Sequence, residues 1–302
     1  MTSVAVVAHR KKTLGGGLPE LRRLLSDRGI DRPAWYEVSK SRQAPGYVRD
    51  AIEDGADMIL VWGGDGTVQR ALDAVASSSQ PRGGGPTVGI IPAGTANLLA
   101  VNLGIPQDLE RAVDIALDGN RRSLDLGVVN GEHFGVMAGT GLDALMMKEA
   151  DSGLKKRMGR LAYLWTGVRA ARTQPVGMCV TVDGAKWFEG PAGCLLFGNM
   201  GRLTGGLVAF PDARYDDGQL EIGVVTAGSP AGWVPVLGRL LRGRPDRSKS
   251  VLTTRGREIR IDLDRAMPYE LDGGDRDETA ELSVCVNPHA VSVSVPLEGG
   301  PQ

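Results

Sequence analysis

Two glycine-rich phrases in this chain combine residue types suited to phosphate chemistry. The first is Val61-Trp62-Gly63-Gly64-Asp65-Gly66-Thr67, and the second is Ile91-Pro92-Ala93-Gly94-Thr95-Ala96-Asn97. Glycine allows a phosphate to approach backbone N–H groups closely, and these groups are good donors to anions. Asp65 adds a fixed carboxylate, which suits orientation of a phosphate-bound metal or of an attacking group. Together the two phrases predict a cradle for nucleotide phosphates.

The surrounding elements place both phrases at the ends of parallel strands. Each phrase follows an apolar, β-branched run, at 58–62 and 88–91, and each leads into a helical pattern. Further strands are predicted at 4–8 and 34–38, with helices at 19–28, 45–55, 68–78 and 108–117. This alternation predicts an open parallel sheet that binds ligands at the carboxyl ends of its strands. A tight turn with a helix-capping Asp would explain the first phrase alone, but the pairing disfavours that interpretation.

The second half of the chain has a different pattern, with many short strands separated by turns. Strands are predicted at 123–129, 133–137, 177–182, 194–197, 220–225, 258–263, 281–286 and 291–295, with a helical segment over about 142–172. We therefore expect an α/β N-terminal domain with a parallel sheet and a largely antiparallel β-sandwich C-terminal domain. The expected domains are 1–122 and 123–287, and the segment from about 288 to 302 is expected to pack back on the first.

Composition excludes several other classes. The 302 residues carry a formal net charge of −1 with a pI near 6.3, so nothing indicates a nucleic-acid partner. Three cysteines stand singly, as expected for buried thiols in a reducing cytoplasm, and three scattered histidines suggest neither a metal triad nor a hydrolase. No apolar stretch approaches the ~20 residues of a membrane-spanning helix. We expect a cytoplasmic protein whose membrane contact, if it exists, is peripheral at the inner face.

At this point the chain resembles a known family. The second phrase continues as Asn97-Leu98-Leu99-Ala100 and then Asn102-Leu103-Gly104-Ile105-Pro106. With the first phrase, this pattern resembles the lipid kinase family of diacylglycerol kinase and sphingosine kinase catalytic domains, particularly the bacterial soluble diacylglycerol kinases. Asp125-Leu126-Gly127 and Leu271-Asp272-Gly273 extend the resemblance over nearly the whole chain. NAD kinase shares the aspartate loop and the two-domain plan but lacks the continuation, so it is a more remote alternative.

The resemblance implies an ATP- and Mg²⁺-dependent lipid kinase that phosphorylates the hydroxyl of diacylglycerol or a similar lipid, as in phospholipid biosynthesis. The nucleotide would bind the first domain, and the lipid would bind the second. Ser39 is a further candidate contact, although a helix N-cap explains it equally well. The residues implied in nucleotide binding are Ser39, Gly63, Gly64, Asp65, Gly66, Thr67, Gly94, Thr95 and Asn97.

Several acidic residues have roles implied by the same resemblance. Asp125 matches a family active-site carboxylate, although a turn aspartate is the simpler interpretation. Bacterial relatives have a glutamate where this chain has Gly274, so the catalytic base is left between Asp272 and Asp275. Asp216 and Asp217 match a structural Mg²⁺ site in part, and an unoccupied turn explains them nearly as well.

The loop after the first strand also departs from the family. It reads His9-Arg10-Lys11-Lys12, where relatives have an Asn-Pro phosphate loop with small residues. These cations either pair with phosphate or form a solvated loop. The departures leave open a catalytically impaired homologue that binds lipid or nucleotide without turnover.

Two basic regions bear on membrane contact. The segment 154–172 has a basic, amphipathic pattern with aromatic residues, and a second basic run at 239–249 follows an apolar helical pattern at 233–241. Both patterns suit an anionic membrane surface, and both also suit a core-packed helix with a solvated basic face. The sequence does not specify the lipid, and it leaves the oligomeric state open, a homodimer included.

Overall fold

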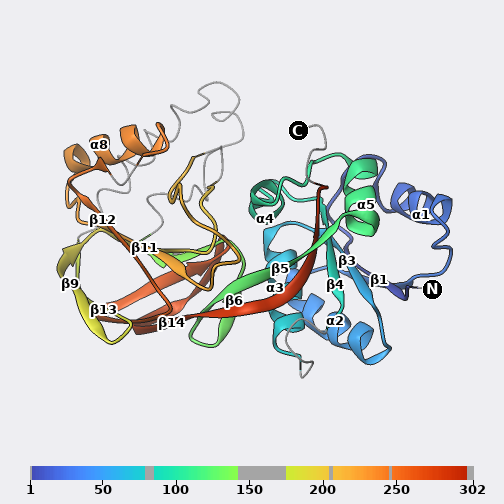
Figure 1. The fold of residues 1–302 in the computed structure, drawn as a ribbon, viewed down its shortest axis with the longest axis horizontal. Coiled ribbons are helices and arrows are strands. Elements are labelled where there is room, and N and C mark those ends of the chain that lie inside the picture. Colours follow the sequence, from blue (N-terminus) through green and yellow to red (C-terminus); the bar gives the residue numbers. More distant parts are fainter. Residues whose placement is uncertain (1, 79–84, 142–174, 204–206, 245–246, 298–302) are drawn as a thin grey trace. The chain divides into compact units, whose positions relative to one another are not determined.

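The structure, a computed structural model, describes residues 2–78, 85–141, 175–203, 207–244 and 247–297 (Figure 1). Its contacts divide the chain into two compact units. The first unit comprises Met1–Leu126, His133–Gly135 and Asn287–Gln302, and the second comprises Gly127–Glu132 and Val136–Val286. The helical segment predicted at 142–172 lies outside the described residues.

The first unit is built on a parallel sheet with the strand order β14-β4-β3-β1-β2. All residues of β1, β3 and β4 are buried, which explains why these strands form unbroken apolar runs in the sequence. Gly63 at the end of β3 pairs with Pro92 at the end of β4, so the glycine loops that follow start side by side. The first four strands are β1 (Val4–His9), β2 (Ala34–Val38), β3 (Met58–Gly63) and β4 (Thr87–Pro92).

Helices cover both faces of this sheet (Figure 1). Helix α1 contacts α5, which packs on β4, whereas α2 contacts α3, which packs on β3. The predicted helices at 19–28, 45–55, 68–78 and 108–117 correspond to α1, α2, α3 and α5. The helical elements are α1 (Gly17–Asp27), the 3-10 turn η1 (Ser41–Gln43), α2 (Ala44–Glu53), α3 (Asp65–Ala76), α4 (Leu98–Asn102) and α5 (Leu109–Asp118).

The second unit is antiparallel. Its strands follow the order β12-β11-β10-β7-β13-β14, while β8 pairs with both β13 and β9. Irregular pairing between Asp262 and Tyr269 divides β13, so that its first part pairs with β8 and its last with β7. The remaining elements are β5 (Asn120–Val129), β6 (Glu132–Phe134), β7 (Met137–Thr140), β8 (Val176–Val182), β9 (Ala185–Ala192), β10 (Cys194–Gly198), β11 (Leu220–Val225), α8 (Pro230–Leu240), β12 (Val251–Gly256), β13 (Glu258–Leu271) and β14 (Gly274–Val295).

The predicted fold class, a parallel α/β unit followed by a largely antiparallel β unit, is confirmed. Three strand predictions were wrong in detail. The single strand predicted at 133–137 is two strands, β6 and β7, because the amides of Val136 and Met137 bind the Asp272 side chain. The strands predicted at 281–286 and 291–295 are one continuous strand, β14, and the predictions missed β9 and β12. In the part of the chain that the structure describes, no helix is long and apolar enough to cross a membrane.

Candidate nucleotide and phosphoryl-transfer site

The two glycine loops of the first unit touch each other through their backbones. A Cβ atom added at Gly94 would lie 2.4 Å from the Gly64 Cα, and one added at Gly64 would lie 3.0 Å from the Gly94 Cα. The first distance leaves no room for a side chain, so Gly94 must be glycine, and at Gly64 a side chain would require the facing backbone to shift by a few tenths of an ångström. Strands β3 and β4 end in register, at Gly63 and Pro92, and this creates the contact between the loops. The sequence prediction that the two phrases form one cradle agrees with it.

Asp65 holds the two loops together. It is the first residue of α3, and its Oδ2 accepts the Asn97 N–H at 3.0 Å, while its Oδ1 accepts the Leu98 N–H at 2.5 Å. Burial raises the pKa of the Asp65 carboxyl, although these amides and the nearby Lys12 charge oppose the rise. Both carboxylate oxygens are therefore engaged with the backbone at the start of α4, so Asp65 sets the geometry of the cradle.

Asn97 shapes the second loop from within. It adopts a left-handed backbone conformation with φ of 49°, and its side chain is 4% exposed. Its Oδ1 accepts the Gly94 N–H at 2.8 Å, and its Nδ2 donates to the carbonyl oxygens of Pro92 and Gly94 at 3.2 and 3.0 Å. The amide side chain thus closes the loop on itself, and the neighbouring Thr95 lies exposed at the tip.

Ser41, which the sequence reasoning missed, meets the first loop. Its Oγ lies 2.9 Å from the Thr67 Oγ1 and 3.9 Å from a Cβ added at Gly66. Ser39, the predicted contact, instead donates its hydroxyl to the Gln43 Oε1 at 3.1 Å at the start of α2. A role for Ser39 in nucleotide binding stays a prediction. The only sequence signal for Ser41 was its position between the second strand and the next helix.

Asp125 lies inside β5, as the strand predicted at 123–129 requires, and not in a turn. Its side chain is 1% exposed, and its Oδ1 accepts the His289 N–H at 2.7 Å. Both residues belong to the first unit, so Asp125 fastens the last part of the chain there. A buried, hydrogen-bonded carboxylate of this kind is compatible with the positioning role that the family resemblance implies.

The candidate base Asp272 lies in the second unit, in the turn between β13 and β14. Asp272 and Gly273 have φ values of 47° and 79°, which is the pattern of a two-residue type I′ hairpin turn. The Asp272 Oδ1 accepts the N–H groups of Val136 and Met137, each at 2.9 Å, and the residue is 6% exposed. Asp275 lies exposed at the start of β14. Two backbone amides therefore hold the Asp272 carboxylate in place.

Glu270 is a second buried carboxyl that the sequence analysis did not single out. It lies two residues before Asp272 on β13 and is 4% exposed. Burial raises the pKa of the Cys194 thiol, and the Glu270 charge adds to that rise. The sequence signal for Glu270 was a charged residue at a position where the alternating pattern of a strand places a buried side chain.

The proposed metal residues lie in a loop of the second unit. The Asp217 Oδ1 accepts the Gln219 N–H at 3.1 Å, and the Asp216 Oδ1 lies 3.4 Å from the Arg214 Nε. Across the described residues, no group of three or more His, Cys, Asp and Glu side chains could hold a metal ion. A cation at Asp216 and Asp217 would therefore need backbone oxygens as well, and this assignment stays a prediction.

A hollow of about 740 Å³ opens at the other ends of the strands of the first unit. It is lined at the starts of β1, β2 and β3 by Val4, Ala34 and Met58. Since ligands of open parallel sheets bind at the carboxyl ends of the strands, this hollow is not the expected nucleotide site. None of the predicted site residues is among its described lining.

Comparison with known proteins identifies the class. The model of the diacylglycerol kinase catalytic domain matches residues 10–129, and the model of the YegS C-terminal NAD kinase beta sandwich-like domain matches residues 136–295. The latter covers more than half of the chain. This architecture is that of a kinase with a parallel α/β unit and a β-sandwich unit.

Curated relatives agree. A diacylglycerol kinase of Bacillus subtilis (strain 168) is 30% identical over 80% of each chain. A protein named probable lipid kinase YegS-like, from Xanthomonas campestris pv. campestris (strain 8004), is 30% identical over 91% of this chain and 90% of its own. The chain therefore belongs to the diacylglycerol kinase and YegS-like family of lipid kinases, and its relatives are phosphotransferases.

Solved structures show the same fold. A diacylglycerol kinase from Bacillus anthracis str. Sterne superposes with a TM-score of 0.76 at 21% identity, covering 97% of this chain and 96% of that one. An NAD kinase from Archaeoglobus fulgidus, solved in complex with ATP, gives a TM-score of 0.52 at 10% identity, covering 96% and 93%. These likenesses confirm the predicted relation of the fold to both kinase classes.

Proposed function

We propose that this protein transfers the terminal phosphoryl group of ATP to the hydroxyl of diacylglycerol or a similar lipid. The observation that carries the proposal is the backbone contact of Gly64 with Gly94, closed by the Asp65 carboxylate. This contact brings the first turn of α3 beside the second loop, where glycines allow a phosphate to approach backbone N–H groups closely. Membership of the lipid kinase family supplies the phosphoryl acceptor class and implies ATP as the donor.

The magnesium ion of the proposal would arrive on the nucleotide phosphates. Mg²⁺ in such sites is held by one or two carboxylates together with phosphate oxygens and water, and Asp65 would be the carboxylate of the cradle that faces it. When bound, the ion would neutralise charge on the transferred phosphoryl group. Residues of the chain position the phosphate-binding loops. Asp65 and Asn97 hold the two loops together, and the contact of Thr67 with Ser41 fixes the start of α3.

The proposed base for the lipid hydroxyl is Asp272, with Asp275 as the alternative. A general base must be held in place, and two backbone amides hold Asp272 through one carboxylate oxygen. In this assignment, the nucleotide belongs to the first unit and the lipid to the second. Asp125 would act as a buried positioning carboxylate.

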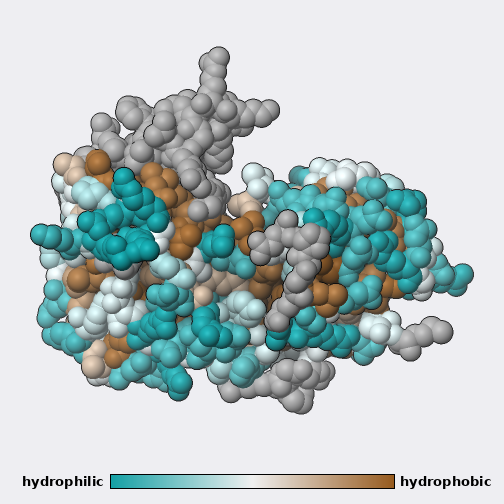
Figure 2. Space-filling model, turned by 45° about the horizontal axis from the view of Figure 1, so that its top comes forward, coloured by the Kyte–Doolittle hydropathy of each residue, from teal (hydrophilic) through white to brown (hydrophobic). Residues whose placement is uncertain are grey.

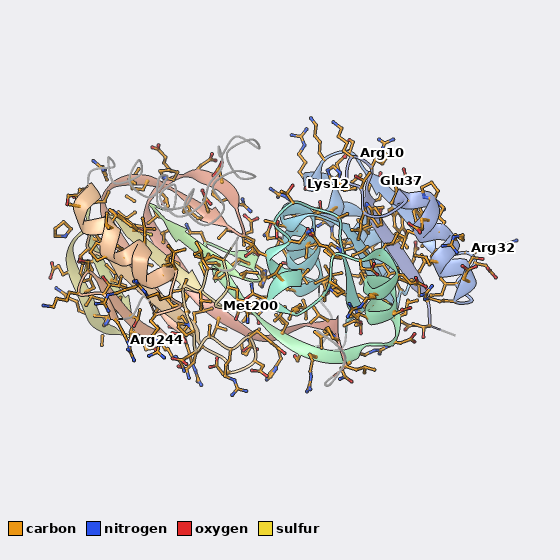
Figure 3. All side chains as sticks on the ribbon, turned by 90° about the horizontal axis from the view of Figure 1, so that it is seen from above. Arg10, Lys12, Arg32, Glu37, Met200 and Arg244 are labelled. Atoms are coloured by element: carbon orange, nitrogen blue, oxygen red, sulfur yellow. The ribbon has the colours of Figure 1, made fainter. Side chains whose placement is uncertain are left out.

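We further propose peripheral contact with the inner face of an anionic membrane through α8 and the segment that follows. Figure 2 shows hydrophobic side chains beside strongly hydrophilic ones in the part of the second unit that carries α8, where Val234 is 53% exposed. Figure 3 shows Arg244 beside this helix. Attraction to anionic lipids and insertion of a small apolar tip are the two terms of such binding. The cations of this surface are Arg239, Arg242, Arg244, Arg247 and Lys249. The other predicted membrane segment, 154–172, lies outside the described residues.

The test is transfer of labelled γ-phosphate from ATP with Mg²⁺ to diacylglycerol in mixed micelles. Asp65→Asn keeps the side-chain shape but removes one of two acceptors, so we expect a loss of at least roughly tenfold in kcat/KM. Asp50→Asn, at an exposed position of α2, is the matched control. Asp272→Asn should cost about 100-fold or more, and Asp275→Asn should cost little. Equal activity of wild type and Asp65→Asn would contradict the proposal.

A second candidate is a homologue that binds nucleotide or lipid without turnover. It is favoured by Gly274, which stands where relatives have a glutamate, and by the two amide contacts already made by Asp272. Nucleotide binding without phosphate transfer to diacylglycerol or a sphingoid base would favour this candidate. Transfer to NAD instead would support the NAD kinase alternative.

A further inference from the structure

The loop after β1 contains three consecutive cations, and one of them differs from its neighbours. Arg10 and Lys11 are exposed, whereas Lys12 is partly buried. A Cβ atom added at Gly64 would lie 3.9 Å from the Lys12 Cε, so the end of this side chain lies beside the glycine contact of the cradle. Figure 3 shows Arg10 and Lys12 at the same end of the first unit, with Arg32 away from them.

The backbone of Lys12 is held from two sides. The indole Nε1 of Trp62, a fully buried residue of β3, donates to the Lys12 carbonyl oxygen at 3.1 Å. The Lys12 N–H donates to the His9 carbonyl oxygen at 3.0 Å, which forms a turn at the end of β1. Trp62 directly precedes Gly63 and Gly64, so the same strand that starts the first glycine loop also positions Lys12.

The fold leaves the Lys12 ammonium group available to a ligand. Among the described residues, no hydrogen bond or ion pair is made by the Lys12 Nζ. The Lys12 charge acts on Asp65, but both oxygens of that carboxylate already accept the backbone amides of Asn97 and Leu98. Lys12 nevertheless acts electrostatically on this region. Burial lowers the pKa of His9 and the Lys12 charge lowers it further, and the same charge opposes the rise in the pKa of Asp65.

We infer that the Lys12 ammonium binds the terminal phosphate oxygens of a nucleoside triphosphate in the cradle. This inference rests on the proposed nucleotide site and adds the residue that makes the site prefer a triphosphate. A lysine acts on phosphate as a compact point charge, so it favours ligands with more charge at the far end of the phosphate chain. Lys12 would thereby supply donors that a glycine-rich first loop would otherwise supply through backbone amides.

The experiment is calorimetric titration of ATP and AMP, each with Mg²⁺, into wild type, Lys12→Met and Lys11→Met. Lys11 is the adjacent, exposed lysine and serves as the matched control. We expect Lys12→Met to weaken ATP binding roughly 10- to 100-fold, as for loss of a hydrogen bond to a charged group, and to change AMP binding less than about twofold. Lys11→Met should leave both affinities unchanged, and Lys12→Arg should recover part of the ATP affinity.

The possible results separate the two proposals. If wild type and Lys12→Met bound ATP with equal affinity, the proposed role of Lys12 would be overturned, whereas the proposed nucleotide site would be unaffected. Equal losses for ATP and AMP, with a lower melting temperature, would show that Lys12 only supports the loop, which also overturns the inference. Wild type that binds neither nucleotide would contradict the proposed function itself, and the inference with it.

Discussion

At the scale of single residues, the cradle depends on glycines because they have no side chain. Gly64 and Gly94 meet through Cα atoms, whereas Gly66 faces open space with the Ser41 Oγ 3.9 Å from an added Cβ. The three glycines are equivalent in sequence but not in the structure. Of these three, Gly94 has no room for a side chain, Gly64 is tight, and Gly66 has room.

Gly94→Ala should therefore damage the site, and Gly66→Ala should not damage the fold. The added methyl at Gly94 would lie 2.4 Å from the Gly64 Cα and 2.5 Å from the Asn97 Oδ1, so the backbone must shift. We expect a loss of about 1–3 kcal/mol in the free energy of unfolding by urea denaturation, and loss of ATP binding by titration. Gly66→Ala should keep wild-type stability. Similar stability losses in both variants would contradict this account.

A partly buried contact between His133 and Asp73 in the same unit gives a pH dependence. The His133 N–H and its ring Nδ1 both contact the Asp73 Oδ1, at 3.0 and 2.9 Å. Burial alone would raise the pKa of Asp73, but these hydrogen bonds and the His133 charge outweigh it and leave the pKa lowered. An acid with a lowered folded pKa contributes stability above its ordinary value, and this contribution is lost as the pH falls through the folded pKa.

Asp73→Asn removes this titrating contribution. The stability difference between wild type and Asp73→Asn should be fully present near pH 5 and should shrink as the pH falls below about 4, the ordinary range of an aspartate. Urea unfolding curves across this range measure it. A difference that does not change with pH would mean that Asp73 titrates with its ordinary pKa.

At the scale of elements, hairpin turns explain where strand predictions succeeded and failed. Asp272-Gly273 joins β13 to β14, and Asp183-Gly184, with φ values of 48° and 82°, joins β8 to β9. The second Asp-Gly is a strong hairpin signal, and it would have revealed the missed strand β9. The break between β6 and β7 had no such signal, since it depends on Asp272, which is distant in sequence.

The turn between β13 and β14 also allows the family pattern to be restored. Gly274 does not have a positive φ, and an added Cβ would lie 3.0 Å from the Arg276 Nη1 and 3.3 Å from the Leu271 carbonyl oxygen. A side chain is tight there, and it fits if Arg276, which is paired with Glu132, and the Leu271 carbonyl each give by a few tenths of an ångström. We expect Gly274→Glu to fold normally and to raise lipid phosphorylation by roughly tenfold or more, because it adds a carboxylate beside the proposed base.

Gly274→Gln is the control for this prediction, since it has the same shape without the charge. Initial rates of phosphate transfer and thermal melting of both variants provide the measurement. If the two variants had equal activity, the missing glutamate would not be what limits turnover.

At the scale of the whole molecule, the end of the chain completes the parallel sheet that the first part of the chain forms. The last part of β14 pairs in parallel with β4, through Ser292 with Thr87 and Val293 with Val88. Three of its side chains, Val291, Val293 and Val295, are 1%, 0% and 7% exposed. The first unit thus combines segments that are far apart in sequence, and it cannot be complete without the last of them, Asn287–Gln302.

A chain that ends at Val286 should therefore lose the first unit. Burial of one valine contributes about 1.5–3 kcal/mol, so the loss of three approaches the total stability of an ordinary domain. We expect the shortened chain to lose its cooperative thermal transition and ATP binding. Leu297→Ala, at a side chain that is 59% exposed, should melt like wild type. A shortened chain that melts within a few degrees of wild type would refute this prediction.

The sequence by itself determined the fold class, the two glycine phrases as the candidate cradle, and the lipid kinase family. These follow from local patterns, since unbroken apolar runs mark buried parallel strands and glycines mark backbone that must approach a phosphate. Only the tertiary structure decided which oxygens and amides meet. Asp65 with Leu98, Asp272 with Val136 and Ser41 with Thr67 are partners across different elements. Such pairs depend on strand order and register, and a single sequence does not encode these in any local pattern.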